Sequence, residues 1–286
     1  MRGPAVLAVF AHPDDETLAA GALLAKLAAG GVDTHLVIAT AGEGGWKGSP
    51  RPAPAEIARR RGMELRAAAQ VLGVRTVRVL WFPDGKVEQV PEEAAVATIA
   101  ASIREVRPAA VLTFGPDGIT GHPDHAAVSR FTTSAVTIAA ATPATTMPEA
   151  MYPPPPIEAV WHVGMAAAQH RAYEALIGPL EWRRVEPPLR PGPWEDWTIT
   201  GAVDTRAHVG TVRNAVLCHA SQLRDADALR SAPVSAWQAA FGRIALRRAL
   251  TLGDGSDPIA RQLELPVPFL EFDPPAGGVL TAMGAA

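Results

Sequence analysis

The sequence AVLAVF at residues 5–10 is followed at once by AHPDDE at residues 11–16. A continuous apolar run of this length is typical of a strand that is buried on both faces of a parallel sheet. Residues 18–29, rich in Ala and Leu, predict a helix. His12, Asp14 and Asp15 therefore lie where a strand passes into a helix. In open α/β sheets, ligands bind at this end of the strands.

Strand and helix patterns alternate through the first half of the chain. Further strands are predicted at residues 34–40, 76–81, 109–114 and 158–163, and further helices at residues 55–72, 91–106, 126–139, 205–222 and 235–250. The alternation predicts an α/β fold with a mostly parallel sheet and helices on both faces. We expect one domain over residues 1–286, with a core at about 1–140 plus 157–222 and an irregular C-terminal extension at 223–286.

Composition narrows the class of protein. The formal net charge is −3 and no block of Lys and Arg is present, which argues against nucleic acid or an anionic membrane as partner. The apolar residues 132–150 are too interrupted by Pro, Thr and Glu to span a bilayer. Cys218 is the single cysteine, so we expect no internal disulfide and a cytoplasmic protein. The oligomeric state stays open, a homo-oligomer included.

A second polar motif, GHPDH at residues 121–125, follows the strand predicted at residues 109–114. Right-handed crossovers bring the strand-end loops to one edge of the sheet, so the two motifs can meet. Two imidazoles and one carboxylate with an open position are typical of catalytic zinc, and the same set suits iron(II). The set would come from His12, one of Asp14 or Asp15, His122 and His125. Two structural alternatives are that Asp15 or Thr17 caps the helix and that His122 only hydrogen-bonds the site.

The two motifs, together with RGME at residues 61–64 and Asp84-Gly85, resemble the signatures of the LmbE-like or PIG-L deacetylases. The resemblance implies a Rossmann-like fold and a zinc-dependent enzyme that removes N-acyl groups, chiefly from N-acetylglucosamine conjugates. It implies zinc ligation by His12, Asp15 and His125. By the same resemblance Asp14 would be the general base, and His122 the general acid or an oxyanion stabiliser oriented by Asp124. Arg61 and Asp84 would bind the amino-sugar substrate.

Two other functions remain open from the sequence. The same chemistry could act on another amide, such as a thiol conjugate or an antibiotic intermediate. Alternatively, the chain could be a metal-containing sugar-binding protein without turnover, although a second carboxylate such as Asp14 beside a ligand favours catalysis. A dinucleotide-binding protein is disfavoured because no glycine fingerprint follows the first strand.

Overall fold

The computed structural model describes residues 4–141, 156–223, 225–253 and 257–263. Within these residues the chain forms a seven-stranded sheet in the order β3-β2-β1-β4-β5-β7-β6. The strands are β1 (Ala5–Phe10), β2 (Asp33–Thr40), β3 (Thr76–Phe82), β4 (Ala110–Phe114), β5 (Ala159–Gly164), β6 (Gly201–Asp204) and β7 (Arg243–Thr251).

The strands β1 to β5 are parallel, and β7 runs antiparallel between β5 and β6. The mostly parallel α/β sheet predicted from the sequence is therefore confirmed. Strands β1 and β4 are fully buried over their central residues, which explains their continuous apolar sequences.

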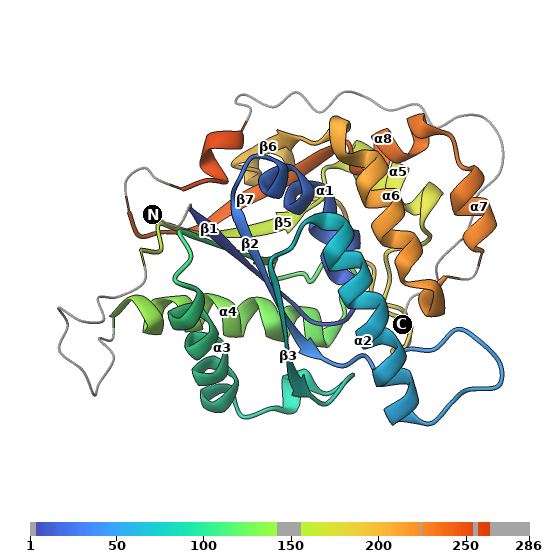
Figure 1. The fold of residues 1–286 in the computed structure, drawn as a ribbon, viewed down its shortest axis with the longest axis horizontal. Helices are drawn as coiled ribbons and strands as arrows, with labels where there is room; N and C mark the ends of the chain where they lie inside the picture. Colours follow the sequence, from blue (N-terminus) through green and yellow to red (C-terminus); the bar gives the residue numbers. More distant parts are fainter. Residues whose placement is uncertain (1–3, 142–155, 224, 254–256, 264–286) are drawn as a thin grey trace.

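Helices cover both faces of the sheet (Figure 1). Helices α3 and α4 pack together, and α1, α2 and α6 form a second packed group. Helices α5 and α8 also pack against each other. The bounds are α1 (Asp15–Ala29), α2 (Pro54–Leu72), α3 (Glu92–Val106), α4 (Pro123–Ala141), α5 (Ala167–Leu176), α6 (Val209–Cys218), α7 (Ala226–Ser231) and α8 (Val234–Phe241).

The strand order creates a crevice at the edge where the motifs lie. From β1 the chain builds outward to β2 and β3 on one side, and β4 and β5 extend the sheet on the other. The loop after β1 leads to α1, which packs with α2 and α6, whereas the loop after β4 leads to α4, which packs with α3. Such a change of direction leaves a crevice beyond the carboxyl ends of the two central strands.

One predicted element is wrong. The sequence predicted a helix at residues 235–250, but the helix α8 ends at Phe241 and β7 begins at Arg243. Gly242 separates the two elements. The Ala, Leu and Arg residues of β7 have good helix propensity, yet their backbone groups pair with β5 on one side and β6 on the other. Long-range sheet pairing thus outweighs local propensity.

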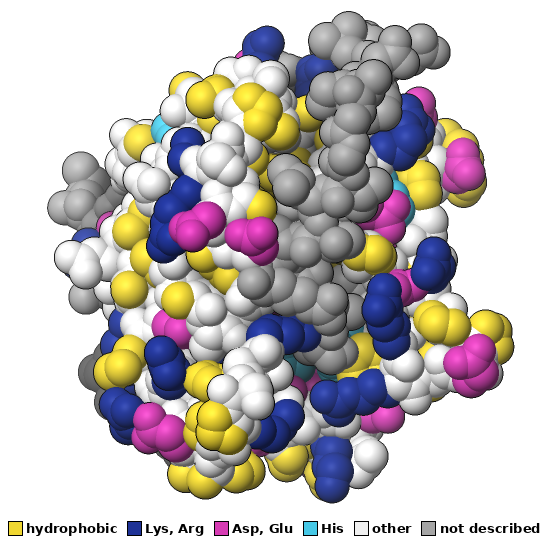
Figure 2. Space-filling view, turned by 90° about the vertical axis from the view of Figure 1, so that its right-hand side faces the viewer, with side chains coloured by type: hydrophobic (Ala, Val, Ile, Leu, Met, Phe, Trp, Pro, Cys, Tyr) yellow, Lys and Arg dark blue, Asp and Glu magenta, His cyan; other side chains and the backbone are white. Residues whose placement is uncertain are grey.

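The other differences are smaller. The predicted helix at residues 205–222 is α6 with a 3₁₀ turn at each end, and the sequence did not predict β6, α5 or α7. Most of the Pro-rich stretch at residues 142–156 lies outside the described residues. Among the helices that the structure does describe, none combines the length and the apolar character needed to cross a membrane. Figure 2 shows Lys and Arg interspersed with Asp and Glu on one face.

Candidate active site

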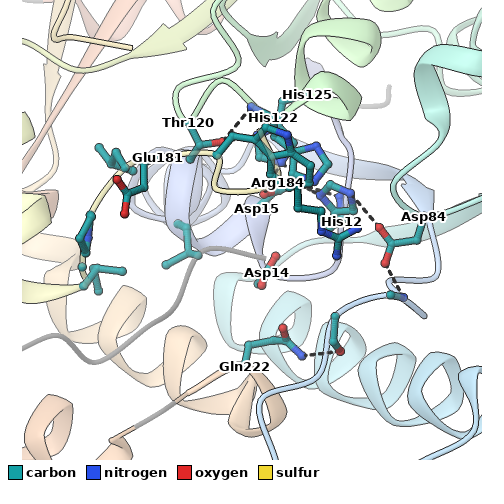
Figure 3. A pocket seen from close by; sticks show the side chains of 18 of the residues that line it. His12, Asp14, Asp15, Asp84, Thr120, His122, His125, Glu181, Arg184 and Gln222 are labelled. Carbon is teal, nitrogen blue, oxygen red and sulfur yellow. Dashed lines mark hydrogen bonds and ion pairs between the residues drawn. The ribbon is translucent and has the colours of Figure 1, made fainter. Parts of the chain in front are cut away.

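The two motifs come together where the strand order predicts. AHPDDE leaves β1 and enters α1, which begins at Asp15, and GHPDH precedes and opens α4, which begins at Pro123. Because β1 and β4 are paired neighbours, their end loops face each other although about 110 residues of sequence separate them. In Figure 3 the side chains of His12, His122 and His125 converge on one point.

Three side chains form a compact donor triangle. His12 Nδ1 lies 3.1 Å from His125 Nε2. Each carboxylate oxygen of Asp15 lies 3.4 Å from one of these nitrogens. In a tetrahedral zinc site with bonds of about 2.0–2.1 Å, neighbouring ligand atoms are about 3.3 Å apart. The triangle therefore has the dimensions of a metal site, and all three side chains are nearly inaccessible to solvent.

The hydrogen bonds of the two imidazoles favour lone pairs that face the triangle. His12 Nε2 lies 3.1 Å from both Asp124 Oδ2 and Asp84 Oδ1, so this nitrogen carries the proton. His125 Nδ1 lies 2.9 Å from the carbonyl oxygen of Gly118 and donates to it. Each histidine therefore keeps an unprotonated nitrogen toward the other and toward a carboxylate. Such a cluster of acceptors needs a cation between them, as in carboxylate–histidine–metal sites.

The charges around His12 also favour a cation in the donor triangle. Burial lowers the pKa of His12, but its hydrogen bonds to Asp124, Asp15 and Asp84 outweigh burial and hold the pKa well above its usual value. Burial raises the pKa of Asp15, and His125 and His12 reverse this and lower it. The carboxylates thus attract one positive charge into the site. A metal ion between the donor atoms would supply that charge.

The contacts of the Asp124 carboxylate differ from those predicted. The sequence predicted that it orients His122, but its carboxylate contacts His12 and accepts hydrogen bonds from the backbone N–H groups of Gly85 and Val87. Only the backbone N–H of Asp124 reaches His122, where it donates to Nδ1 at 3.1 Å. Asp124 is the second residue of α4, and the carboxylate turns toward the loop after β3, whose N–H groups it satisfies.

His122 lies beside the triangle as a neutral hydrogen-bond donor. Its Nδ1 accepts the backbone bond, so the proton is on Nε2, and a protonated nitrogen does not ligate a metal. Donor atoms of His12, His122 and His125 do lie within 4.8 Å of one another, so distance alone would admit His122 as a ligand. Burial lowers the pKa of His122, and the neighbouring His125, His12 and Arg184 lower it further.

Asp14 lies next to the triangle in a strained backbone conformation. The backbone angle φ of Asp14 is 126°, a value that residues other than glycine rarely adopt. Asp14 is the N-cap residue of α1, but its carboxylate accepts no hydrogen bond from the N–H groups of the helix. The capping alternative named Asp15 or Thr17 instead, and the carboxylate of Asp15 accepts the backbone N–H of His12, which precedes the helix. Burial raises the pKa of Asp14 to about 6, although the charge of Arg61 acts to lower it. Arg61 Nη2 lies 3.2 Å from Asp14 Oδ2.

Arg61 and Asp84, predicted to bind substrate, both line the cavity but are also held by the protein. Arg61 donates to the carbonyl oxygens of Pro13 and Gly42 at 2.5 and 2.9 Å, and the residue is 2% exposed. Asp84 Oδ2 accepts the backbone N–H of Gly44 at 2.7 Å. Arg61 therefore fixes the loop that carries Asp14.

The pocket has a wall that the sequence did not predict. The cavity encloses about 830 Å³, open solvent included, and residues 177–182 and Arg184 form one side of it. The ring of Trp182 lies 3.8 Å from that of His122, and the guanidinium of Arg184 lies over Trp182. No sequence pattern marked this segment, because it follows α5 as an irregular loop. Gln222 and Tyr173 also line the cavity.

His219, at the C-terminal end of α6, supports the first motif from behind. It is buried, and its Nε2 lies 2.7 Å from Glu16 Oε1. Burial lowers the pKa of His219, but the charge and hydrogen bond of Glu16 outweigh burial and raise it. Glu16 Oε2 in turn accepts the backbone N–H of Asp14 at 2.9 Å. The pair therefore holds the backbone of the residue that is next to the donor triangle.

Comparison with known proteins agrees with this geometry. The family model described as PIG-L, GlcNAc-PI de-N-acetylase, matches residues 7–136. A 1D-myo-inositol 2-acetamido-2-deoxy-alpha-D-glucopyranoside deacetylase of Rhodococcus erythropolis is 34% identical over 241 residues, which cover 76% of this chain and 81% of that protein. A protein of the same name from Kineococcus radiotolerans is 42% identical over 83 residues, which span 28% of this chain and only 23% of the relative.

A solved structure shows the same fold. The crystal structure of a conserved protein from Thermus thermophilus has a TM-score of 0.60 and 25% sequence identity, covering 88% of this chain and 97% of that one. The long match to the Rhodococcus relative covers most of the chain, and the family model spans both motifs. This chain belongs to the PIG-L family of GlcNAc-PI de-N-acetylases.

Proposed function

We propose that this protein is a metal-dependent amidohydrolase that removes the N-acetyl group from an N-acetylglucosamine-type amino sugar or its conjugate. The observation that carries the proposal is the donor triangle with a further carboxylate, Asp14, beside it in an accessible cavity. The relatives named as deacetylases of an acetamido-glucopyranoside support this substrate class. The single cysteine supports a cytoplasmic location.

His12, Asp15 and His125 would hold the metal. We propose zinc, because two imidazoles and a carboxylate at this spacing suit it, and iron(II) is the alternative that these ligand types allow. When bound, the metal would polarise the acyl carbonyl and lower the pKa of a water. Asp124 and Asp84 keep the proton of His12 on Nε2 and so leave Nδ1 free for the metal.

The other residues supply positioning and proton transfer. Asp14 accepts a proton from the attacking water, and its pKa of about 6 suits a base that must release this proton again. Arg61 holds the Asp14 carboxylate in place. Neutral His122 donates its Nε2–H to the reacting amide, and Trp182 packs against its ring and excludes water from that side. The proton on Asp14 then passes to the departing amine.

The proposal is tested with zinc-loaded protein and a panel of N-acetylglucosaminides and their conjugates, with release of free amine as the readout. Chelated protein is the control for metal dependence, and Asp14→Asn is the control for the base. We expect zinc-dependent release by the wild type and a loss of about 10²–10⁴-fold in kcat for Asp14→Asn with metal content unchanged. No release from any member by metal-loaded wild type would refute the amino-sugar substrate. Near wild-type turnover by Asp14→Asn would refute the base.

A further inference from the structure

Tyr173, on α5, is a buried polar residue whose hydroxyl the protein does not use. The residue is 4% exposed, and its ring packs 5.4 Å from that of Phe241. Within the described part of the chain its hydroxyl makes no hydrogen bond. Buried tyrosine hydroxyls are normally paired, and an unpaired one destabilises the folded state. The Tyr173 hydroxyl is not one of the fully buried atoms that lack a partner, so it keeps contact with the cavity that the residue lines, where a ligand can take the place of water as its partner.

The position of Tyr173 indicates which part of a ligand it would meet. It lines the main cavity together with Asp14 and His122, and it also lines a smaller cavity beside Asp15 and His125. Apart from Thr120, the remaining walls of the smaller cavity are apolar, formed by Leu18, Ala19, Phe114, Ile119, Met165 and Leu180. Tyr173 thus lines the end of the site that contains the donor triangle. By contrast, Gly44, Asp84 and Gln222 line only the main cavity.

The chemistry of this end of the site calls for a hydrogen-bond donor. An amide carbonyl placed between Asp14 and the donor triangle gains negative charge on its oxygen as water adds to its carbon. The neighbouring carboxylates, Asp14 and Asp15, would repel that charge. Burial raises the pKa of Tyr173 well above its usual value, and both carboxylates raise it further, so the phenol remains protonated and can only donate to such an oxygen.

We propose that Tyr173 is a catalytic residue that donates a hydrogen bond to the acyl carbonyl oxygen of the substrate as this oxygen becomes negative. This inference rests on the proposed amidohydrolase function. Tyr173 keeps its proton throughout. Water adds to the carbonyl carbon, the C–N bond breaks, and the water proton reaches the amine through Asp14. The acyl group leaves as a carboxylic acid, which keeps the second proton of the water and ionises in solution, and no bond to Tyr173 forms or breaks.

The test compares Tyr173→Phe with a matched control, Thr132→Val. Tyr173→Phe removes only the hydroxyl and keeps the ring against Phe241. Thr132 on α4 has a fully buried hydroxyl without a partner and lines neither cavity. For both variants we would measure bound zinc, thermal unfolding, and kcat and KM on the best N-acetylglucosaminide of the panel. A second probe is the binding of a methylphosphonamidate of the same amino sugar, whose tetrahedral oxygens mimic the charged carbonyl oxygen.

We expect Tyr173→Phe to bind zinc normally, to unfold at or above the wild-type temperature, and to keep KM while kcat falls about 10²–10³-fold. Its affinity for the methylphosphonamidate should fall, whereas its affinity for glucosamine should not. Thr132→Val should match the wild type in all kinetic measurements. Wild-type kcat in Tyr173→Phe, a raised KM with unchanged kcat, or loss of zinc would each overturn the inference while the amidohydrolase function stands. Inactive metal-loaded wild type would overturn the function itself, and this inference with it.

Discussion

The substitution Asp124→Asn tests whether a carboxylate outside the donor triangle controls the metal. Asp124 is fully buried. Its Oδ2 lies 3.1 Å from His12 Nε2 and accepts the N–H of Gly85 at 2.7 Å, and its Oδ1 accepts the N–H of Val87 at 2.9 Å. The carboxylate therefore faces three donors, and asparagine has nearly the same shape but only one acceptor oxygen.

The contacts of Asp124 allow the loss of zinc affinity and of unfolding free energy in Asp124→Asn to be estimated. If the amide oxygen remains on Val87, the amide NH₂ faces the donors of Gly85 and His12. His12 can then accept from the NH₂ only by moving its proton to Nδ1, the nitrogen that faces the metal position. Loss of such an orienting partner weakens metal binding by about 10–100-fold, or about 1.4–2.8 kcal/mol. The unpaired N–H of Gly85 costs about 1–3 kcal/mol of the unfolding free energy.

The assay is competition for zinc between the protein and a chelator of known affinity, together with urea unfolding of the chelated protein. Asp84→Asn is the matched comparison, because Asp84 also lies 3.1 Å from His12 Nε2 and Asp124 remains in place when it is changed. We expect a smaller loss of zinc affinity for Asp84→Asn than for Asp124→Asn. Unchanged zinc affinity in Asp124→Asn would refute the assignment of the His12 proton to Nε2.

Two further substitutions test other parts of the structure. Arg61→Lys should lower kcat more than it raises KM, because the guanidinium positions Asp14, and steady-state kinetics would show the reverse if Arg61 mainly bound the sugar. His162, on β5, is 6% exposed, and burial, with a smaller effect from Arg247, lowers its pKa to about 4. The unfolded state therefore takes up a proton between about pH 6.5 and pH 4 that the folded state does not, which lowers the unfolding free energy by about 3 kcal/mol as the pH falls. Urea unfolding at pH 7 and pH 4 should show that the unfolding free energy of His162→Gln falls less than that of the wild type. An equal fall in both proteins would refute the contribution of His162.

Much of the fold and of the site follows from local sequence. The buried strands β1 and β4 have continuous apolar sequences, and the helix predicted at residues 55–72 ends as α2 does, before Gly73 with a positive φ of 76°. Since parallel strands end at a common edge, the meeting of His12 and His125 could also be predicted. Donor types that suit a metal are visible in the sequence because they depend on side-chain chemistry alone.

The tertiary structure decided what each of these groups contacts. Asp124 follows His122 closely in sequence, yet its carboxylate turns to His12. The backbone N–H groups of Gly85 and Val87, which donate to this carboxylate, lie on that side. Tyr173 reaches the site from α5, which the sequence pattern did not reveal. β7 takes the place of a predicted helix because β5 and β6 leave a gap that only a strand can pair with. Residue types and the alternation of strands and helices in the first half of the chain are determined locally, whereas the pairing of later strands, hydrogen-bond partners and cavity walls depend on segments far apart in the chain.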